Sequence, residues 1–164
     1  MLAARDTVVQ STLPAISSIA GPLLTFEGIN NNCACLPPDT NGDIGPSNYV
    51  QVVNMHFRVF NKFTGAPQTG ILPINSLFAG LGNPCETTND GDPIVLYDRA
   101  ADRWFLAQFG QTGNKMYIAV SVTGDPTGSY YTYTFTSPEF PDYLKFSVWT
   151  DGYYMTSNQT QKVF

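Results

Sequence analysis

The stretch that decides the fold is residues 92–136, DPIVLYDRAADRWFLAQFGQTGNKMYIAVSVTGDPTGSYYTYTFT. It holds four runs in which apolar and aromatic residues follow a strand pattern, and three polar joints separate them. Each joint has about five residues, the usual length of a hairpin loop, so no helix or crossover fits between the runs. The stretch therefore predicts a four-stranded antiparallel meander. The four runs are Pro93–Tyr97, Arg103–Phe109, Lys115–Val122 and Tyr130–Phe135.

A hairpin is predicted on each side of this meander. Residues 49–54 and 56–62 alternate with the period of a strand, and so do residues 145–149 and 153–157. The second hairpin is joined through Asp151-Gly152, a strong turn signal because glycine accepts the positive φ of the favoured turns.

The remaining segments contain weaker signals. Residues 33–47 are so rich in Pro, Gly, Asp and Asn that we expect no strand ladder there. Residues 66–91 predict a long connection with at most one short turn at 74–81. In the N-terminal part only residues 23–26 could form a short strand.

These pieces repeat. A loop with Gly, Asp or Pro leads into an apolar strand, a tight turn and an aromatic strand, beginning near Gly45, Gly91 and Pro141. Such spacing, with four strands in the complete copy, is typical of β-propeller blades. We therefore predict an all-β fold of antiparallel four-stranded meanders arranged as propeller-like blades in an incomplete ring, with Trp104 buried against an adjacent sheet. A β-sandwich is the alternative.

Two regions follow from this interpretation. Residues 1–32 are predicted to be an N-terminal extension with at most one strand, and residues 33–164 a propeller-like β domain of about three blade-like units. Total helix should stay below about a tenth of the chain, against a usual share near one third.

Composition limits the classes of partner. Charged residues make up 13% of the chain, about half of the usual share, and the net charge is −5 without any cluster of Lys or Arg. Nucleic-acid binding depends mainly on Lys and Arg side chains that contact phosphates, so we expect no nucleic-acid partner. No run of 18 apolar residues occurs, so we expect no membrane span. A low-charge surface rich in Asn, Thr and Tyr favours a secreted or cell-surface location.

Several segments, taken in order, resemble those of uncharacterised secreted bacterial proteins with propeller-like blades. The resemblance covers residues 33–158, and it implies an extracellular location and blades of a propeller-like domain carried by large extracellular proteins. It implies no activity. The segments are PPDTNGDIGP (37–46), NYVQVVN (48–54), TTNDGDP (87–93), YD and ADRW (97–104), GDPTG (124–128), FPDY (140–143) and VW with DGYYM (148–155).

The three cysteines favour one disulfide. Cys33 and Cys35 have a single residue between them, too close for the usual two-residue zinc knuckle, and Cys85 has no cysteine or histidine near it. We predict a bond from this pair to Cys85, taken as Cys35–Cys85, that closes a loop of about 50 residues. Three buried thiols are the alternative.

The loop after the cysteine pair has the oxygen donors that calcium prefers. Asp39, Asn41 and Asp43 alternate, so that one loop could wrap an ion. The alternative is a turn in which the carboxylates accept hydrogen bonds from local backbone N–H groups. A second and less regular acidic loop contains Asn89, Asp90 and Asp92.

Carboxylates at the starts of first strands would also suit a glycoside hydrolase. Asp43, Asp92 and Asp142 fall there if the repeats are aligned as above, and two such groups about 5 to 9 Å apart could act as acid and as nucleophile or base. Glutamate, the usual acid of raised pKa, occurs only three times.

Three functions remain open from the sequence. The one we favour is an extracellular binding or display module for a glycan or a cell-surface protein, stabilised by calcium. The second is a self-assembling structural subunit of a fibre or surface layer, a homo-oligomer joined through open strand edges. The third is the carbohydrate-active hydrolase, with Asp92 and a second aspartate as its pair.

Overall fold

The structure, a computed structural model, describes residue 12, residues 20–82 and residues 84–158. Of these residues 45% are in strands and 6% are helical, and all sheets are antiparallel. The all-β prediction and the low helix content are therefore confirmed. Within the same residues no helix is long and apolar enough to cross a membrane.

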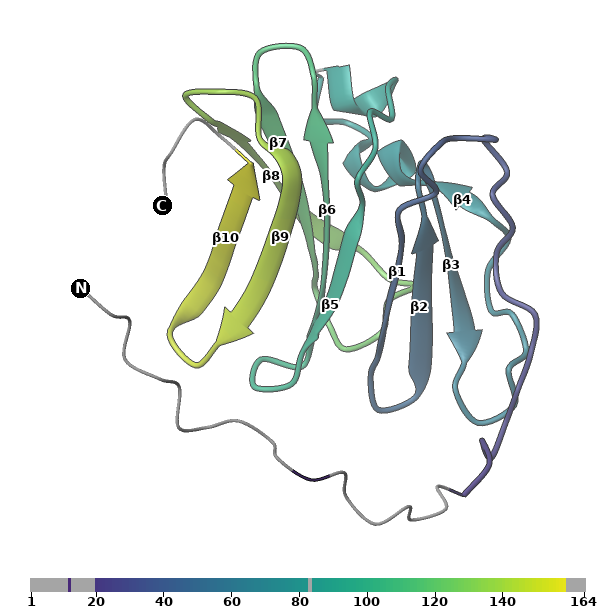
Figure 1. Cartoon of the computed structure of the whole chain (residues 1–164). Coiled ribbons are helices and arrows are strands. Elements are labelled where there is room, and N and C mark those ends of the chain that lie inside the picture. Colours follow the sequence, from purple (N-terminus) through teal and green to yellow (C-terminus); the bar gives the residue numbers. More distant parts are fainter. Residues whose placement is uncertain (1–11, 13–19, 83, 159–164) are drawn as a thin grey trace.

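In the described residues, ten strands form three sheets in which strands adjacent in sequence are also adjacent in space (Figure 1). Two short 3₁₀ helices, η1 (Ile74–Phe78) and η2 (Pro84–Glu86), follow the first sheet. The first sheet contains β1 (Thr40–Ile44), β2 (Asn48–Val53), β3 (His56–Asn61) and β4 (Leu72–Pro73). The second contains β5 (Ile94–Asp98), β6 (Arg103–Gly110), β7 (Lys115–Ser121) and β8 (Tyr130–Thr136), and the third β9 (Asp142–Trp149) and β10 (Gly152–Asn158).

The second sheet is the predicted meander. Its four strands begin and end within one or two residues of the predicted runs, and each pairs with the next in antiparallel register. Both predicted hairpins are present as well, β2 with β3 and β9 with β10. Hydrophobic alternation was sufficient to locate these strands because each has one face on a neighbouring sheet.

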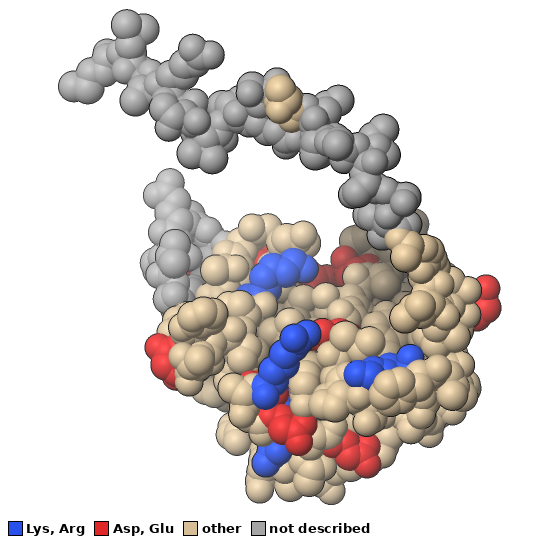
Figure 2. All heavy atoms as spheres, turned by 90° about the horizontal axis from the view of Figure 1, so that it is seen from below, with Lys and Arg blue, Asp and Glu red and all other residues tan. Residues whose placement is uncertain are grey.

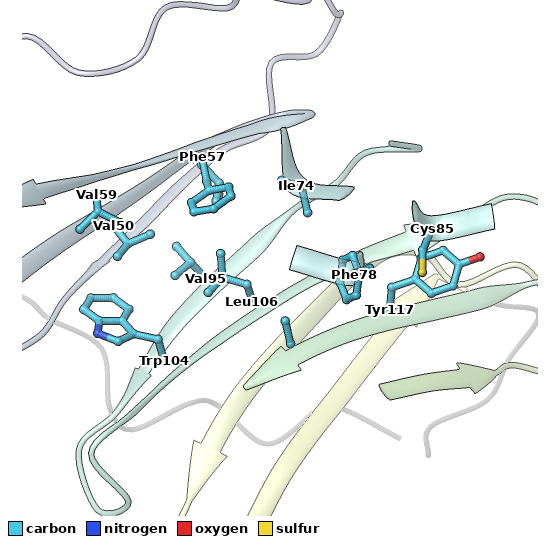
Figure 3. Packing of buried hydrophobic residues seen from close by; sticks show 12 residues of the cluster. Val50, Phe57, Val59, Ile74, Phe78, Cys85, Val95, Trp104, Leu106 and Tyr117 are labelled. Atoms are coloured by element: carbon cyan, nitrogen blue, oxygen red, sulfur yellow. The ribbon is translucent and has the colours of Figure 1, made fainter. Parts of the chain in front are cut away.

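The three sheets are packed in series through their first strands. β1 contacts β5 and β5 contacts β9, and in Figure 1 these strands run side by side in the same direction. Buried side chains between the first and second sheets include Val50 and Val59 on one side and Val95, Trp104 and Leu106 on the other (Figure 3). The main core is therefore the space between these two sheets.

Trp104 confirms the expected burial against an adjacent sheet. Its side chain has no exposed surface, its ring centroid lies 5.0 Å from that of Tyr97, and its indole N–H donates to the Gly124 carbonyl at 3.1 Å. Gly45, in the turn between β1 and β2, lies against the indole, and a Cβ there would approach the ring to 2.7 Å. This turn of the first sheet therefore requires glycine.

Charged side chains are sparse on the end of the molecule seen in Figure 2. Blue and red residues are interspersed there, and most of the visible described surface carries no charge. This face has no single-sign patch, in agreement with the low content of charged residues.

We predicted no strand ladder in residues 33–47, and this prediction is wrong. Residues 40–44 form β1, which pairs in regular register with β2, from Thr40 opposite Val53 to Ile44 opposite Tyr49. The pattern hid this strand because its alternate side chains are polar and make hydrogen bonds to β5, as described below.

The described part of the predicted N-terminal extension contains no strand, so residues 23–26 do not form the one short strand that the sequence allowed. Most of the extension lies outside the described residues. The Phe26 ring lies 5.2 Å from that of Phe60, and the Ile29 N–H donates to Gln51 Oε1 at 2.8 Å. This segment therefore covers the outer face of the first sheet through side-chain contacts.

The predicted Cys35–Cys85 disulfide is also wrong. The structure joins Cys33 to Cys35, whereas Cys85 is a fully buried thiol in η2, within the core between the first two sheets. Burial, with the nearby Glu86 charge, raises the pKa of the Cys85 thiol to about 11. Spacing alone misled the prediction because the folded chain places Cys85 inside the core, away from the cysteine pair at the surface.

We expect one titratable thiol in the unreduced protein. A thiol that is buried and protonated at neutral pH reacts slowly, because the thiolate is the nucleophile. Ellman's reagent should therefore detect almost no thiol in the native protein and one after unfolding in guanidinium, with Cys85→Ala as the control that abolishes the signal. Three thiols in the unfolded, unreduced chain would contradict the Cys33–Cys35 bond.

Asp98 links the second and third sheets. Its Oδ2 accepts the Tyr153 hydroxyl at 2.8 Å, and its Oδ1 accepts the N–H groups of Ala100 and Ala101 at 2.9 and 3.0 Å. Burial alone would raise the pKa of this carboxyl, but the hydrogen bonds from Ala101, Tyr153 and Ala100 bring it below its ordinary value. The native state therefore binds this proton less readily than the unfolded chain does.

The stabilisation from Asp98 should depend on pH. It is present above the unfolded pKa of about 3.9 and is lost as the pH falls through the lower folded pKa. We expect Asp98→Asn to reduce the free energy of unfolding by about 1–3 kcal/mol at pH 7, and by progressively less below about pH 4. Urea unfolding across this range measures the difference. A loss that is the same at all pH values would contradict the role of the charge.

Candidate functional site

An aspartate stands at the start of each of the three first strands. Asp39 precedes β1, Asp92 lies two residues before β5, and Asp142 begins β9. Asp39, Asp92 and Tyr143 have φ values of 44°, 47° and 53°, in the left-handed region that residues other than glycine rarely adopt. Because the three strands run side by side in one direction, these irregular starts meet at one end of the molecule (Figure 1).

A small hollow lies where the three starts meet. Its volume is about 170 Å³, room for an ion with a few waters but not for a large organic ligand. Most of its wall consists of carboxylate, hydroxyl and amide groups. One lysine, from β9, also lines it. The lining residues are Asp39, Thr40, Asn41, Asp92, Pro93, Tyr143 and Lys145.

The ionisation of Asp92 is disfavoured in this hollow. Burial raises the pKa of Asp92, and the charges of Asp39 and Asp142 raise it further. A side-chain hydrogen bond with Asp39 acts in the same direction, and only the Tyr143 backbone N–H opposes it. The Lys145 ammonium lies 4.0 Å from the centre of the Tyr143 ring, a cation–π contact. The charges around Asp92 therefore favour the binding of a proton or a cation at this site.

Asn54 supports this cluster from the end of β2. Its side-chain amide donates to the Pro37 carbonyl at 3.2 Å and to Asp39 Oδ2 at 3.3 Å. The residue is only 8% exposed, yet its Oδ1 has no hydrogen-bond partner among the described residues. A Cβ on Gly91 would come within 2.9 Å of this oxygen. A buried acceptor without a protein partner, beside the Asp39 carboxylate, is the kind of group that a cation or a water can satisfy.

Asn41 and Asp43 serve a different purpose from Asp39. Asn41 Oδ1 accepts the Val95 N–H at 2.8 Å, and Asp43 Oδ2 accepts the Tyr97 N–H at 2.7 Å. Asp43 Oδ1 also accepts the N–H of Ile44 at 2.7 Å. These side chains therefore clamp β1 to the edge of β5. Calcium binding by Asp39, Asn41 and Asp43 together stays a prediction.

The second acidic loop divides in a similar way. Asn89 exchanges hydrogen bonds with Asn75, its Oδ1 accepting the Asn75 N–H and its amide donating to Asn75 Oδ1. Asp90 Oδ2 accepts the Gln111 N–H at 2.9 Å, which fixes the turn after β6. Only Asp92 reaches the cluster with Asp39.

The structure thus brings together two residues that the sequence had placed in separate candidate loops, Asp39 and Asp92. Asp43 does not join them, because its carboxylate accepts the N–H of Tyr97 on β5. Sequence reasoning did not identify Asn54 as part of the site. The only sequence signal for Asn54 is its position at the corner between two strands, where it adopts a positive φ of 33°. In the described part of the chain, no group of three or more His, Cys, Asp and Glu side chains is gathered as a ready metal site.

Comparisons with known proteins add no relative to this picture. No protein-family model, curated protein or solved structure matches the chain. Any functional conclusion therefore rests on the geometry of the site itself.

The clamp between β1 and β5 can be tested independently of any metal. Asn41→Ala leaves the N–H of Val95, a fully buried residue, without an acceptor. We expect a loss of about 1–3 kcal/mol in the free energy of unfolding, measured by urea denaturation in excess EDTA. Asn41→Asp keeps an acceptor oxygen at the same position and is the matched control. A loss that occurs only when calcium is present would instead make Asn41 a metal ligand.

Proposed function

We propose that the chain is a secreted, propeller-like binding module that recognises its ligand through a calcium ion held at the joined starts of β1, β5 and β9. Two features support the propeller-like arrangement. Each sheet is built from strands consecutive in sequence, and the sheets pack in series through their first strands. In a sandwich, two sheets would face each other with interleaved connections.

The observation that carries the calcium proposal is the contact between Asp39 and Asp92. Both side chains line the same hollow, and the charges of Asp39 and Asp142 raise the pKa of Asp92, an effect that a bound cation would offset. Calcium takes six to eight oxygen ligands in flexible loops, and an ion beside this pair would find carboxylate, amide and backbone oxygens.

An ion held by only two carboxylates keeps coordination positions for an outside ligand. Hydroxyl pairs of a glycan or carboxylates of a cell-surface protein are oxygen donors of the required type. The hollow is too small for such a ligand to enter whole, so it would approach the ion from the surface. One calcium ion would therefore both stabilise the fold and bind the ligand.

Calcium should raise the melting temperature, and EDTA should reverse the effect. A ligand bound only by the native state stabilises it by about 2.7 kcal/mol at a hundred times its dissociation constant. Magnesium should restore little of this, because it demands a tighter octahedral shell. Asp92→Asn should abolish the response, whereas Asp151→Asn, in the exposed turn between β9 and β10, should retain it. Identical melting curves in calcium and EDTA would contradict the proposal.

Glycoside hydrolysis is a second candidate, favoured by the raised pKa of Asp92, which suits a general acid. Asp92 and Asp39 are hydrogen-bond partners, whereas the carboxyls of retaining enzymes stand roughly 5–5.5 Å apart. Asp142 would therefore have to be the second carboxyl. Hydrolysis of a glycan panel in EDTA that is lost in Asp92→Asn would favour the enzyme over the binding module.

A further inference from the structure

The disulfide between Cys33 and Cys35 closes a very small ring, because only Ala34 separates the two residues. A disulfide stabilises a protein mainly by restricting the unfolded chain, and this effect is smallest for the shortest loops. The bond therefore adds little to the stability of the whole fold. It does fix the local backbone, where Ala34 has a φ of 53°, in the left-handed region that alanine rarely adopts.

The cysteine pair lies at the surface. Both cysteines are half-buried, Ala34 between them is exposed, and Leu36 beside them is 92% exposed. Cys85, by contrast, is fully buried in the core between the first two sheets, so in the native state it does not exchange with the pair. An external thiol can therefore reach the bond, and exchange stays confined to Cys33 and Cys35.

Asn31 holds the pair in a way that suits both redox states. Its Nδ2 donates to the Cys35 carbonyl at 2.7 Å, and its Oδ1 accepts the Cys35 N–H at 3.2 Å. The same Oδ1 lies 3.3 Å from Cys33 Sγ. A disulfide sulfur has no proton to donate, whereas a thiol has one. Reduction of Cys33 therefore adds a hydrogen bond to Asn31 and leaves no polar group without a partner there.

A short run of chain connects the pair to the hollow. Pro37 follows Cys35 by two residues, and its carbonyl accepts the Asn54 side-chain amide at 3.2 Å. The same amide donates to Asp39 Oδ2 at 3.3 Å. The path of the chain from the cysteine pair into β1 therefore helps to set the position of the Asp39 carboxylate in the hollow.

We propose that Cys33 and Cys35 are a site of reversible thiol–disulfide exchange with an external dithiol, and that their redox state sets the calcium affinity of the hollow. A thiolate of the dithiol attacks one sulfur of the pair, so a mixed disulfide forms and the Cys33–Cys35 bond breaks. The second thiol of the dithiol then attacks the mixed disulfide. The dithiol leaves as its own disulfide, and its two electrons and two protons remain on the two cysteines.

Reduction loosens the segment before β1. Without the bond, Ala34 can leave the left-handed region, so calcium has to order about one more residue when it binds. Ordering the backbone of one residue lowers an affinity roughly 5- to 30-fold. This step rests on the proposed calcium site, to which it adds control by the redox state of the cysteine pair.

The exchange is tested on the full chain with buffers of reduced and oxidised dithiothreitol. After an acid quench, alkylation in denaturant and peptide mass spectrometry should show Cys33 and Cys35 changing together and reversibly with the buffer ratio. Cys85 should be alkylated in every sample and is the internal control. Circular dichroism should stay native throughout, because the bond contributes little to the fold.

The effect on calcium is measured by calorimetric titration with calcium chloride, after the dithiothreitol is removed without air. The reduced protein should bind more weakly than the oxidised protein by the factor given above. The double variant Cys33→Ser with Cys35→Ser should bind as weakly as the reduced protein and should not respond to dithiothreitol. Hydrogen exchange without calcium should be faster for the β1 amides in the reduced protein and unchanged for those of β8.

The outcomes separate the two proposals. Equal calcium affinity in both redox states of the folded protein, or unchanged exchange of the β1 amides, would overturn this inference and leave the calcium site standing. Absence of calcium binding to the oxidised protein would overturn both. A pair that dithiothreitol cannot reduce in the native protein, or a protein that unfolds on reduction, would make the bond a structural one and contradict the switch.

Discussion

The packing of the sheets depends on how the backbone N–H groups at the edge of β5 are satisfied. β5 pairs with β6 on one side only, yet it lies in the interior, with Val95 fully buried. A buried N–H without a partner costs about as much as a lost hydrogen bond, so this edge needs acceptors that no neighbouring strand supplies. Asn41 and Asp43 provide them at alternate residues, which matches the two-residue repeat of a strand.

This clamp also fixes the position of the candidate site. Once Asn41 is opposite Val95, residue 39, just before β1, is brought level with the start of β5, and Asp39 and Asp92 line the same hollow. The carboxyls are thus placed together by hydrogen bonds made elsewhere along the same strand. The raised pKa of Asp92 is tolerated because the clamp and the apolar core, which includes Trp104, stabilise the arrangement independently.

Sequence patterns could predict the parts of the fold that depend on apolar alternation. The meander, both hairpins and the burial of Trp104 belong to this class, because each strand has one face on a neighbouring sheet. β1 could not be predicted in this way, since Asn41 and Asp43 read as turn residues until β5 is placed beside them. The candidate site could not be predicted for the same reason, since it also depends on contacts between separate sheets. Asp39 and Asp92 were each recognised as potential ligands, but their contact and the support from Asn54 arise only from the packing of separate sheets.

The two junctions between sheets are built differently, and this difference has consequences for the molecule. The first junction combines the polar clamp with a core that η1 and η2 close at its outer side. The second contains the smaller buried cluster of Ile94, Phe109 and Leu144, together with the aromatic contacts of Phe105 and the hydrogen bond from Tyr153 to Asp98. An apolar groove of about 580 Å³, lined by β7, β8 and β10, lies beside it. A junction with fewer buried contacts opens at lower free energy than a closed one. The third sheet is therefore the part of the described structure that we expect to open at the lower free energy.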